Sequence, residues 1–197
     1  AITELETVTG LSDSAYQIAA VGEEILLAAG ETDRAFRSYA FEANRATTFL
    51  ATYRALLKKY PMIEARSILT HCIERTPGEE GKWFAAARHA GFLDMALDIV
   101  MEHRVEPKTL ITAAREYAST YPEFAVHVAL AAIRDLNAGY GYDDARPADV
   151  LVAYDILMSA AVAAGKSAET IAALRAWLAQ QKPDGLARAV LGHRLGV

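Results

Sequence analysis

The chain has 197 residues, of which 53% are hydrophobic, and a formal net charge of −5. This acidic balance argues against nucleic acid as the main ligand, because phosphate backbones require clustered positive charge. The single cysteine, Cys72, excludes an internal disulfide framework and any zinc site built from several cysteines.

The first part of the chain predicts a lead-in followed by two helices. The opening decapeptide is expected to be frayed, and Ser12 or Ser14 can cap the first helix, because a hydroxyl oxygen there accepts from free backbone N–H groups. The helix is expected to end at Gly30, which readily takes the left-handed conformation of a helix terminus. Thr32 or Asp33 then caps the second helix.

Further helices are predicted by apolar residues that recur at spacings of three and four. Their apolar stripes cover residues 49–57, 63–73, 83–87, 93–100, 110–117, 124–136, 151–161 and 171–178, and a capping helix covers 186–195. Trp83 and Trp177 lie on these stripes and are interpreted as core anchors.

The breaks between these helices recur at nearly constant spacing. Gly30, Pro61, Gly91 and Pro122 are separated by 31, 30 and 31 residues, and Gly165 follows after 43. A fixed period in this range is the signature of stacked helical hairpins. The sequence therefore predicts an all-α fold of about five antiparallel hairpins plus a C-terminal capping helix, in a single domain over residues 1–197.

Several of the turns share one pattern, in which an Ala-Gly pair is followed at a short distance by another alanine. The turns with this pattern are Ala29-Gly30…Ala35, Ala90-Gly91…Ala96 and, more loosely, Ala164-Gly165…Ala172. They resemble the turns of tetratricopeptide-type repeats, although the period near 31 departs from that family's 34. The resemblance implies a right-handed solenoid whose inner groove binds peptides or protein surfaces, and it brings no catalytic residues. Ala35 and Ala96 should then be buried where helices approach closely.

Charge is distributed unevenly along the chain. Residues 1–33 contain seven acids and no Lys or Arg, whereas residues 34–75 contain eight bases and three acids. The basic stretch is typical of solvent-exposed helix faces whose positive charge balances the acidic residues of the first hairpin. It also supplies candidates for pairing with a partner's carboxylates, namely Arg37, Arg45, Arg54 and Arg66.

An insertion near residues 137–147 lengthens the last interval and carries two tyrosines. Tyr140 and Tyr142 flank a glycine and offer rigid contact area with polar tips, which suits recognition at a binding face. The alternative is a packed connector whose tyrosines cover the ends of neighbouring helices.

Residues that would support bond chemistry are sparse. The sequence contains no Gly-rich phosphate loop, His-Glu-x-x-His zinc motif or nucleophile elbow. His71 and Cys72 are adjacent, but neighbours on a helix point about 100° apart, and Cys72 falls on an apolar stripe, which favours a buried inert thiol. We therefore expect no enzymatic activity, no cofactor and no metal site.

Two functional hypotheses follow. The first is a protein–protein interaction or scaffold module that binds a protein or peptide in a groove of stacked hairpins. The second is an accessory domain of a larger enzyme or zinc-containing protein whose active site lies outside this chain. The start at Ala1 favours an excised piece of a longer protein. No apolar run approaches the roughly 20 residues that span a bilayer, so we expect no membrane partner and a cytoplasmic location.

Overall fold

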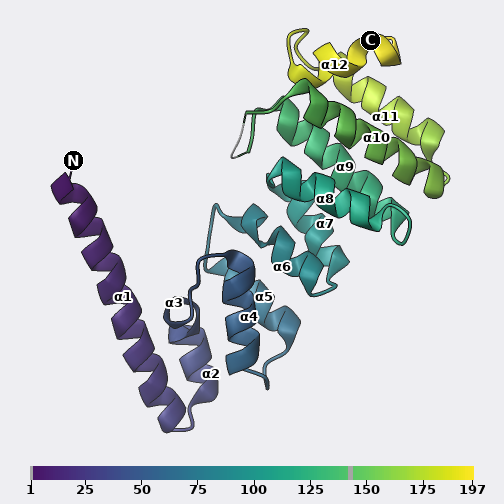
Figure 1. Ribbon diagram of the computed structural model, residues 1–197. Helices are drawn as coiled ribbons and strands as arrows, with labels where there is room; N and C mark the ends of the chain where they lie inside the picture. Colours follow the sequence, from purple (N-terminus) through teal and green to yellow (C-terminus); the bar gives the residue numbers. More distant parts are fainter. Residues whose placement is uncertain (1, 142–143) are drawn as a thin grey trace. The chain divides into compact units, whose positions relative to one another are not determined.

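The computed structural model describes residues 2–141 and 144–197, with side chains from residue 14 onward. All regular structure in these ranges is helical (Figure 1), which confirms the expected all-α class. Contacts divide the chain into two compact units, residues 1–90 and 91–197, which are described separately. The single-domain organisation over residues 1–197 stays a prediction. None of the described helices combines the length and the apolar character that a bilayer crossing requires.

The predicted turns all fall where the sequence placed them. Helices end at Ala28, Lys59, His89, Tyr117 and Ala163, and the next ones begin at Thr32, Ala65, Leu93, Pro122 and Ser167. Gly30 closes the first turn with a φ of 76°, a left-handed conformation that favours glycine. The Glu31 N–H then donates to the Leu26 carbonyl at 2.9 Å, which is the long bond of a Schellman motif.

The first unit begins with a helix longer than the sequence suggested. Helix α1 covers Ile2–Ala28, so the opening decapeptide is helical and Ser12 and Ser14 lie inside the helix rather than at its cap. No proline interrupts this stretch, and serine costs only a few tenths of a kcal/mol inside a helix. Ser12 and Ser14 therefore do not mark the start of α1.

A second helical run follows, made of α2 (Thr32–Ala35), the π-helical turn η1 (Phe36–Ala40) and α3 (Phe41–Ala43). Glu31 occupies the N-cap position without a side-chain hydrogen bond, so the predicted capping by Thr32 or Asp33 is wrong. The run packs against α1. Ala35 and Ala40 are fully buried, as the close approach of two helices requires.

The remaining elements of the first unit are α4 (Phe49–Lys59), α5 (Ala65–Glu74), the 3₁₀ turn η2 (Glu80–Trp83) and α6 (Phe84–His89). Trp83 is fully buried among them, which confirms its expected role as a core anchor. Its indole N–H donates to the Thr76 hydroxyl at 2.7 Å, and its ring meets Phe49 edge-on at 4.8 Å. The core of this unit is therefore aromatic, and the one polar atom of the Trp83 side chain has a hydrogen-bond partner.

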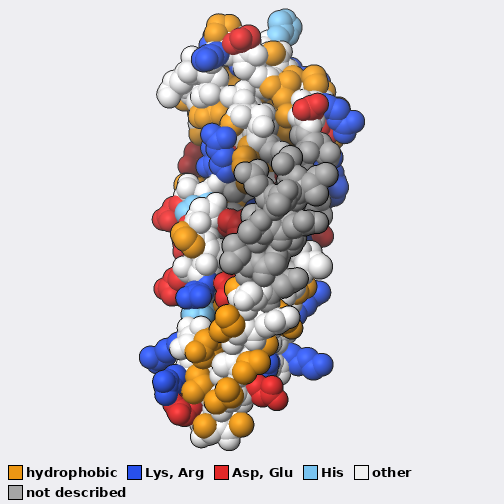
Figure 2. Space-filling view, turned by 90° about the vertical axis from the view of Figure 1, so that its left-hand side faces the viewer, with side chains coloured by type: hydrophobic (Ala, Val, Ile, Leu, Met, Phe, Trp, Pro, Cys, Tyr) orange, Lys and Arg blue, Asp and Glu red, His pale blue; other side chains and the backbone are white. Residues whose placement is uncertain are grey.

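One face of α1 carries apolar side chains that are open to solvent. Ile18, Val21 and Ile25 are 66%, 55% and 61% exposed and follow the three- and four-residue spacing of one helix stripe. Figure 2 shows hydrophobic side chains gathered over this part of α1. The opposite side of the helix, which includes the buried Ala19, packs on the unit.

The second unit contains α7 (Leu93–Glu102), α8 (Pro107–Tyr117), α9 (Pro122–Asn137), α10 (Pro147–Ala163), α11 (Ser167–Ala179) and α12 (Leu186–Leu195). Helix α9 is central, because it packs against α7, α8, α10 and α12. Its buried side chains are mostly alanine, valine and other apolar residues from Phe124 to Leu136. Short side chains let the neighbouring helices approach α9 closely.

The burial of Ala96 in α7 gives a first prediction. Ala96 is 0% exposed, so a leucine at this position has no room and must displace its neighbours. We expect Ala96→Leu to lower the free energy of unfolding by about 1–3 kcal/mol, measured by urea titration with circular dichroism. The control is Leu97→Met, because position 97 is partly exposed and the two side chains have similar volumes. A midpoint for Ala96→Leu equal to that of the unaltered protein would show that the position is not tightly packed.

Candidate functional site

The second unit carries an open, mostly apolar pocket of about 270 Å³. Its walls come from three helices, α7, α9 and α11. The lining residues are Met101, His127, Leu130, Ala131, Arg134, Ala173, Leu174 and Trp177. A concave apolar surface with a few polar groups is the usual form of a binding site, so this pocket, which we call the α9–α11 pocket, is the candidate site of the protein.

The pocket follows from the spacing of side chains on α9. Its four lining residues on this helix fall at 127, 130, 131 and 134, which is one stripe of a helix with 3.6 residues per turn. The residues of α9 between them face α8 and α10 and form the core. Alanine occupies both position 131 on α9 and position 173 on α11. Two methyl groups in place of larger side chains leave the space that the pocket occupies.

Large apolar side chains border this space and stay accessible. Met101 is 63% exposed at the C-terminal turn of α7. Trp177, which the sequence predicts to be a core anchor, is only partly buried. The periodicity of α11 marked Trp177 as inward-facing, but it could not show that Trp177 and an alanine of α9 would line the same pocket. Flexible methionine and half-buried tryptophan are typical of recognition surfaces.

A network of hydrogen bonds fixes the main polar group of the pocket, the guanidinium of Arg134. Its Nε donates to Asp135 Oδ1 at 3.2 Å, and its Nη2 donates to the carbonyls of Val100 at 3.0 Å and His103 at 3.4 Å. These carbonyls lie at the C-terminal end of α7, where the helix dipole favours a cation. Asp135 is 1% exposed and also accepts the Val105 N–H at 3.1 Å. Arg134 is therefore held in one position at the edge of the pocket.

The four arginines predicted to bind a partner lie in the first unit. Arg37, Arg45 and Arg54 are exposed, and Arg66 is partly buried. Arg54 contacts the imidazole of His89, with Nη2 to Nε2 at 3.2 Å. Arg45 lines a small hollow of about 90 Å³ that also includes Trp83. Their role in partner binding stays a prediction.

The two tyrosines of the insertion have different outcomes. Tyr140 is partly buried, and the guanidinium carbon of Arg104 lies 5.9 Å from its ring centre, a distance that allows a cation–π contact. Tyr142 lies outside the described residues. Tyr140 thus contacts a neighbour in its own unit, as a packed connector would.

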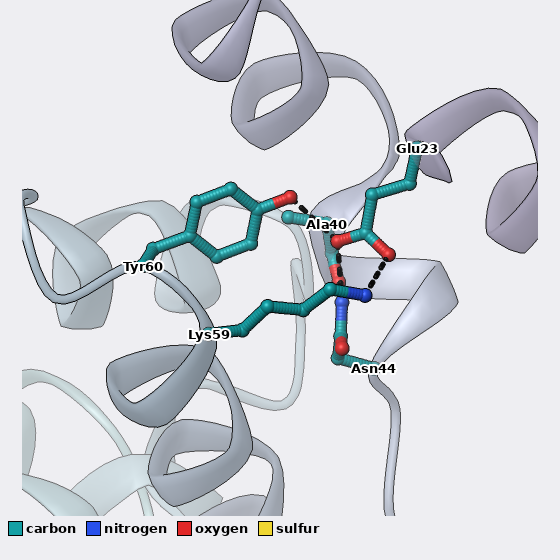
Figure 3. A network of polar contacts seen from close by, with 5 residues as sticks. All are labelled: Glu23, Ala40, Asn44, Lys59 and Tyr60. Atoms are coloured by element: carbon teal, nitrogen blue, oxygen red, sulfur yellow. Dashed lines mark hydrogen bonds and ion pairs between the residues drawn. The ribbon is translucent and has the colours of Figure 1, made fainter. Parts of the chain in front are cut away.

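A buried charged network in the first unit centres on Glu23 of α1, whose carboxylate is 1% exposed (Figure 3). Oε1 accepts from Tyr60 Oη at 2.5 Å and from Asn44 Nδ2 at 2.7 Å, and Oε2 accepts from Lys59 Nζ at 2.6 Å. The Asn44 amide also donates to the Ala40 carbonyl. The network ties α1 to the end of α3 and to the C-terminal end of α4, a structural role.

The Glu23 contacts also affect Tyr60. Burial, and then the hydrogen bond to Glu23, raise the pKa of the Tyr60 phenol far above its usual range. The Tyr60 phenol therefore stays protonated at neutral pH and can donate to Glu23. From the sequence, Glu23 was counted only as one of the acids of residues 1–33, although it follows the buried Ala19 by four residues on the same face of α1.

The described residues contain no group of three or more His, Cys, Asp or Glu side chains that could hold a metal ion. Cys72 is buried, and burial raises the pKa of its thiol to about 12. A raised pKa keeps the thiol neutral, and only the thiolate is a good nucleophile. We expect Cys72 in the folded protein to resist iodoacetamide at mildly alkaline pH and to react fully in concentrated guanidinium chloride. Mass spectrometry of both samples checks this, and rapid alkylation of the folded protein would contradict it.

Comparison with models of known protein families, with curated protein sequences and with solved structures finds no match to this chain.

Proposed function

We propose that this protein is an interaction module that binds a segment of a partner protein in the α9–α11 pocket. The segment inserts one large apolar side chain between α9 and α11, against Trp177 and Met101. In this proposal the hairpins form a tetratricopeptide-like right-handed solenoid in the cytoplasm. The successive hairpins α8–α9 and α10–α11, with α12 packed on α9, α10 and α11, support that arrangement for the second unit.

The observation that carries the proposal is the combination of an open apolar hollow with accessible, adaptable side chains around it. Met101 is 63% exposed and Trp177 is partly exposed, although both are residues that normally gain free energy from burial. Burial of an apolar side chain of a partner against them gains about 25 cal/mol for each Å² removed from water. A central apolar anchor of this kind is where protein interfaces concentrate their binding energy.

A peptide selection tests the proposal without knowledge of the natural partner. Short random peptides displayed on phage are selected on the immobilised protein and then compared on two variants of α11. Ala173→Arg fills the pocket from an exposed lining position, whereas Ala172→Arg adds the same side chain at an exposed neighbour outside the pocket. We expect the enriched peptides to contain a large apolar residue and to lose at least about tenfold in affinity on Ala173→Arg alone.

The selection also tests the arginines of the first unit. Peptides that are lost on an Arg37→Glu/Arg54→Glu variant, while binding to Ala173→Arg persists, would assign recognition to those arginines. If no enriched peptide distinguishes Ala173→Arg from Ala172→Arg, the α9–α11 pocket is not the binding site.

A further inference from the structure

We infer that the segment bound by the α9–α11 pocket carries a carboxylate beside its apolar anchor, so that the partner is an acidic, amphipathic peptide segment. This inference rests on the proposed function and adds the chemistry of the partner. It begins from the polar residues of the pocket. Among the described residues, His127 and Arg134 are the polar side chains that line it, and none of the lining residues is acidic.

The two basic residues lie on the same side of the pocket. They are seven residues apart on α9, a separation that brings side chains back to nearly the same helix face two turns later. Leu130 and Ala131 lie between them on that stripe. A bound segment therefore contacts an apolar surface that has a basic residue at each end. This local basic character contrasts with the net charge of −5 of the whole chain.

Arg134 retains a donor for a ligand. Its Nε and Nη2 are engaged by Asp135 and by the end of α7, whereas its Nη1 has no hydrogen-bond partner among the described residues. The side chain is 39% exposed, compared with 1% for Asp135, so an incoming group reaches the guanidinium and not the carboxylate behind it. Because the guanidinium is already fixed, a ligand that binds it has little side-chain entropy left to lose.

The acidic residue of α9 that lies nearest to His127 in the sequence already forms an ion pair with a lysine. Glu123 lies one turn before His127, and its carboxylate accepts from Lys166 Nζ at 2.8 Å. This ion pair joins the start of α9 to the start of α11 at the surface. His127 is exposed and remains the basic group at that end of the pocket.

The expected ligand follows from these groups. A leucine, methionine or phenylalanine side chain fits the apolar space, and an aspartate or glutamate nearby in the segment accepts a charge-assisted hydrogen bond from Arg134 Nη1. A lysine or arginine at the same place would face the Arg134 guanidinium and be disfavoured by like-charge repulsion. The pocket therefore selects for acidic over basic segments that share the same anchor.

The test uses peptides from the phage selection, synthesised in matched pairs in which each Asp or Glu is replaced by Asn or Gln. Affinities are measured by fluorescence anisotropy of labelled peptides on the unaltered protein and on Arg134→Gln. We expect the amide peptides to bind about tenfold more weakly than their acidic partners on the unaltered protein. On Arg134→Gln the acidic peptides should lose most of this advantage, because Arg134 supplies the charge-assisted hydrogen bond.

The peptide pair keeps the inference falsifiable if Arg134→Gln does not fold, because the protein itself is then unaltered. In one outcome, the peptides lose affinity on Ala173→Arg and still bind the unaltered protein equally well in their acidic and amide forms. That result would overturn the inference and leave the proposed function intact. Enrichment of basic peptides would also overturn it. If no peptide binds Ala173→Arg more weakly than Ala172→Arg, the proposed function itself is overturned.

Discussion

Replacement of Glu23 by alanine is expected to lower the free energy of unfolding by about 3 kcal/mol. The change removes the shared acceptor of Tyr60, Asn44 and Lys59. The Tyr60 side chain is 0% exposed and cannot turn to water, so its hydroxyl loses a partner inside the protein. Lys59 is 40% exposed and regains hydration, which keeps the loss below the upper end known for buried pairs. Urea unfolding followed by circular dichroism measures the difference.

The neighbouring glutamate provides a matched control. Glu24 is the next residue of α1 and has the same charge, but it is exposed, so Glu24→Ala should change the free energy of unfolding by about 0.5 kcal/mol or less. In a double-mutant cycle, Tyr60→Phe should cost much less in the Glu23→Ala background than in the unaltered protein. Equal losses for Glu23→Ala and Glu24→Ala would show that the buried network does not stabilise the first unit.

The second large effect is expected at Trp83. Trp83→Ala should lower the free energy of unfolding by about 3–5 kcal/mol, because a fully buried aromatic ring leaves a cavity that its neighbours fill only in part. The change also removes the donor to the Thr76 hydroxyl. Thermal unfolding monitored by circular dichroism measures it.

The other tryptophan of the chain is the control for Trp83. Trp177 is partly exposed at the α9–α11 pocket, so Trp177→Ala should lower the free energy of unfolding by about 1 kcal/mol. The two variants are thus expected to differ clearly in stability while removing the same side chain. A larger loss for Trp177→Ala than for Trp83→Ala would reverse the assignment of core and surface.

The helical breaks could be predicted from the sequence because each depends on local chemistry. Gly30 and Gly165 end helices in a left-handed conformation that favours glycine, and Pro122 begins α9 where no N–H is needed. Pro61 lies in the turn between α4 and α5, where the break was predicted. Local signals therefore located the turns to within a few residues.

The pocket and the Glu23 network could not be predicted because both depend on contacts between distant segments. The stripe on α11 showed that Trp177 faces inward, but the space beside it depends on Ala131 of α9. Glu23 is buried because Lys59 and Tyr60 reach it from α4 and the residue after it, and no sequence pattern links those positions. Arg134 was missed for the same reason, since its partners are carbonyls at the end of α7.

The most direct test of partner binding in the α9–α11 pocket is a methyl spectrum of the protein labelled with ¹³C at its methionine methyl groups. The chain has four methionines, of which Met101 lines the pocket and Met62 lies exposed in the first unit. On addition of an acidic peptide from the selection, the account predicts that the Met101 signal shifts in proportion to occupancy and that the Met62 signal stays in place. A shift of Met62 with Met101 unchanged would contradict binding in this pocket.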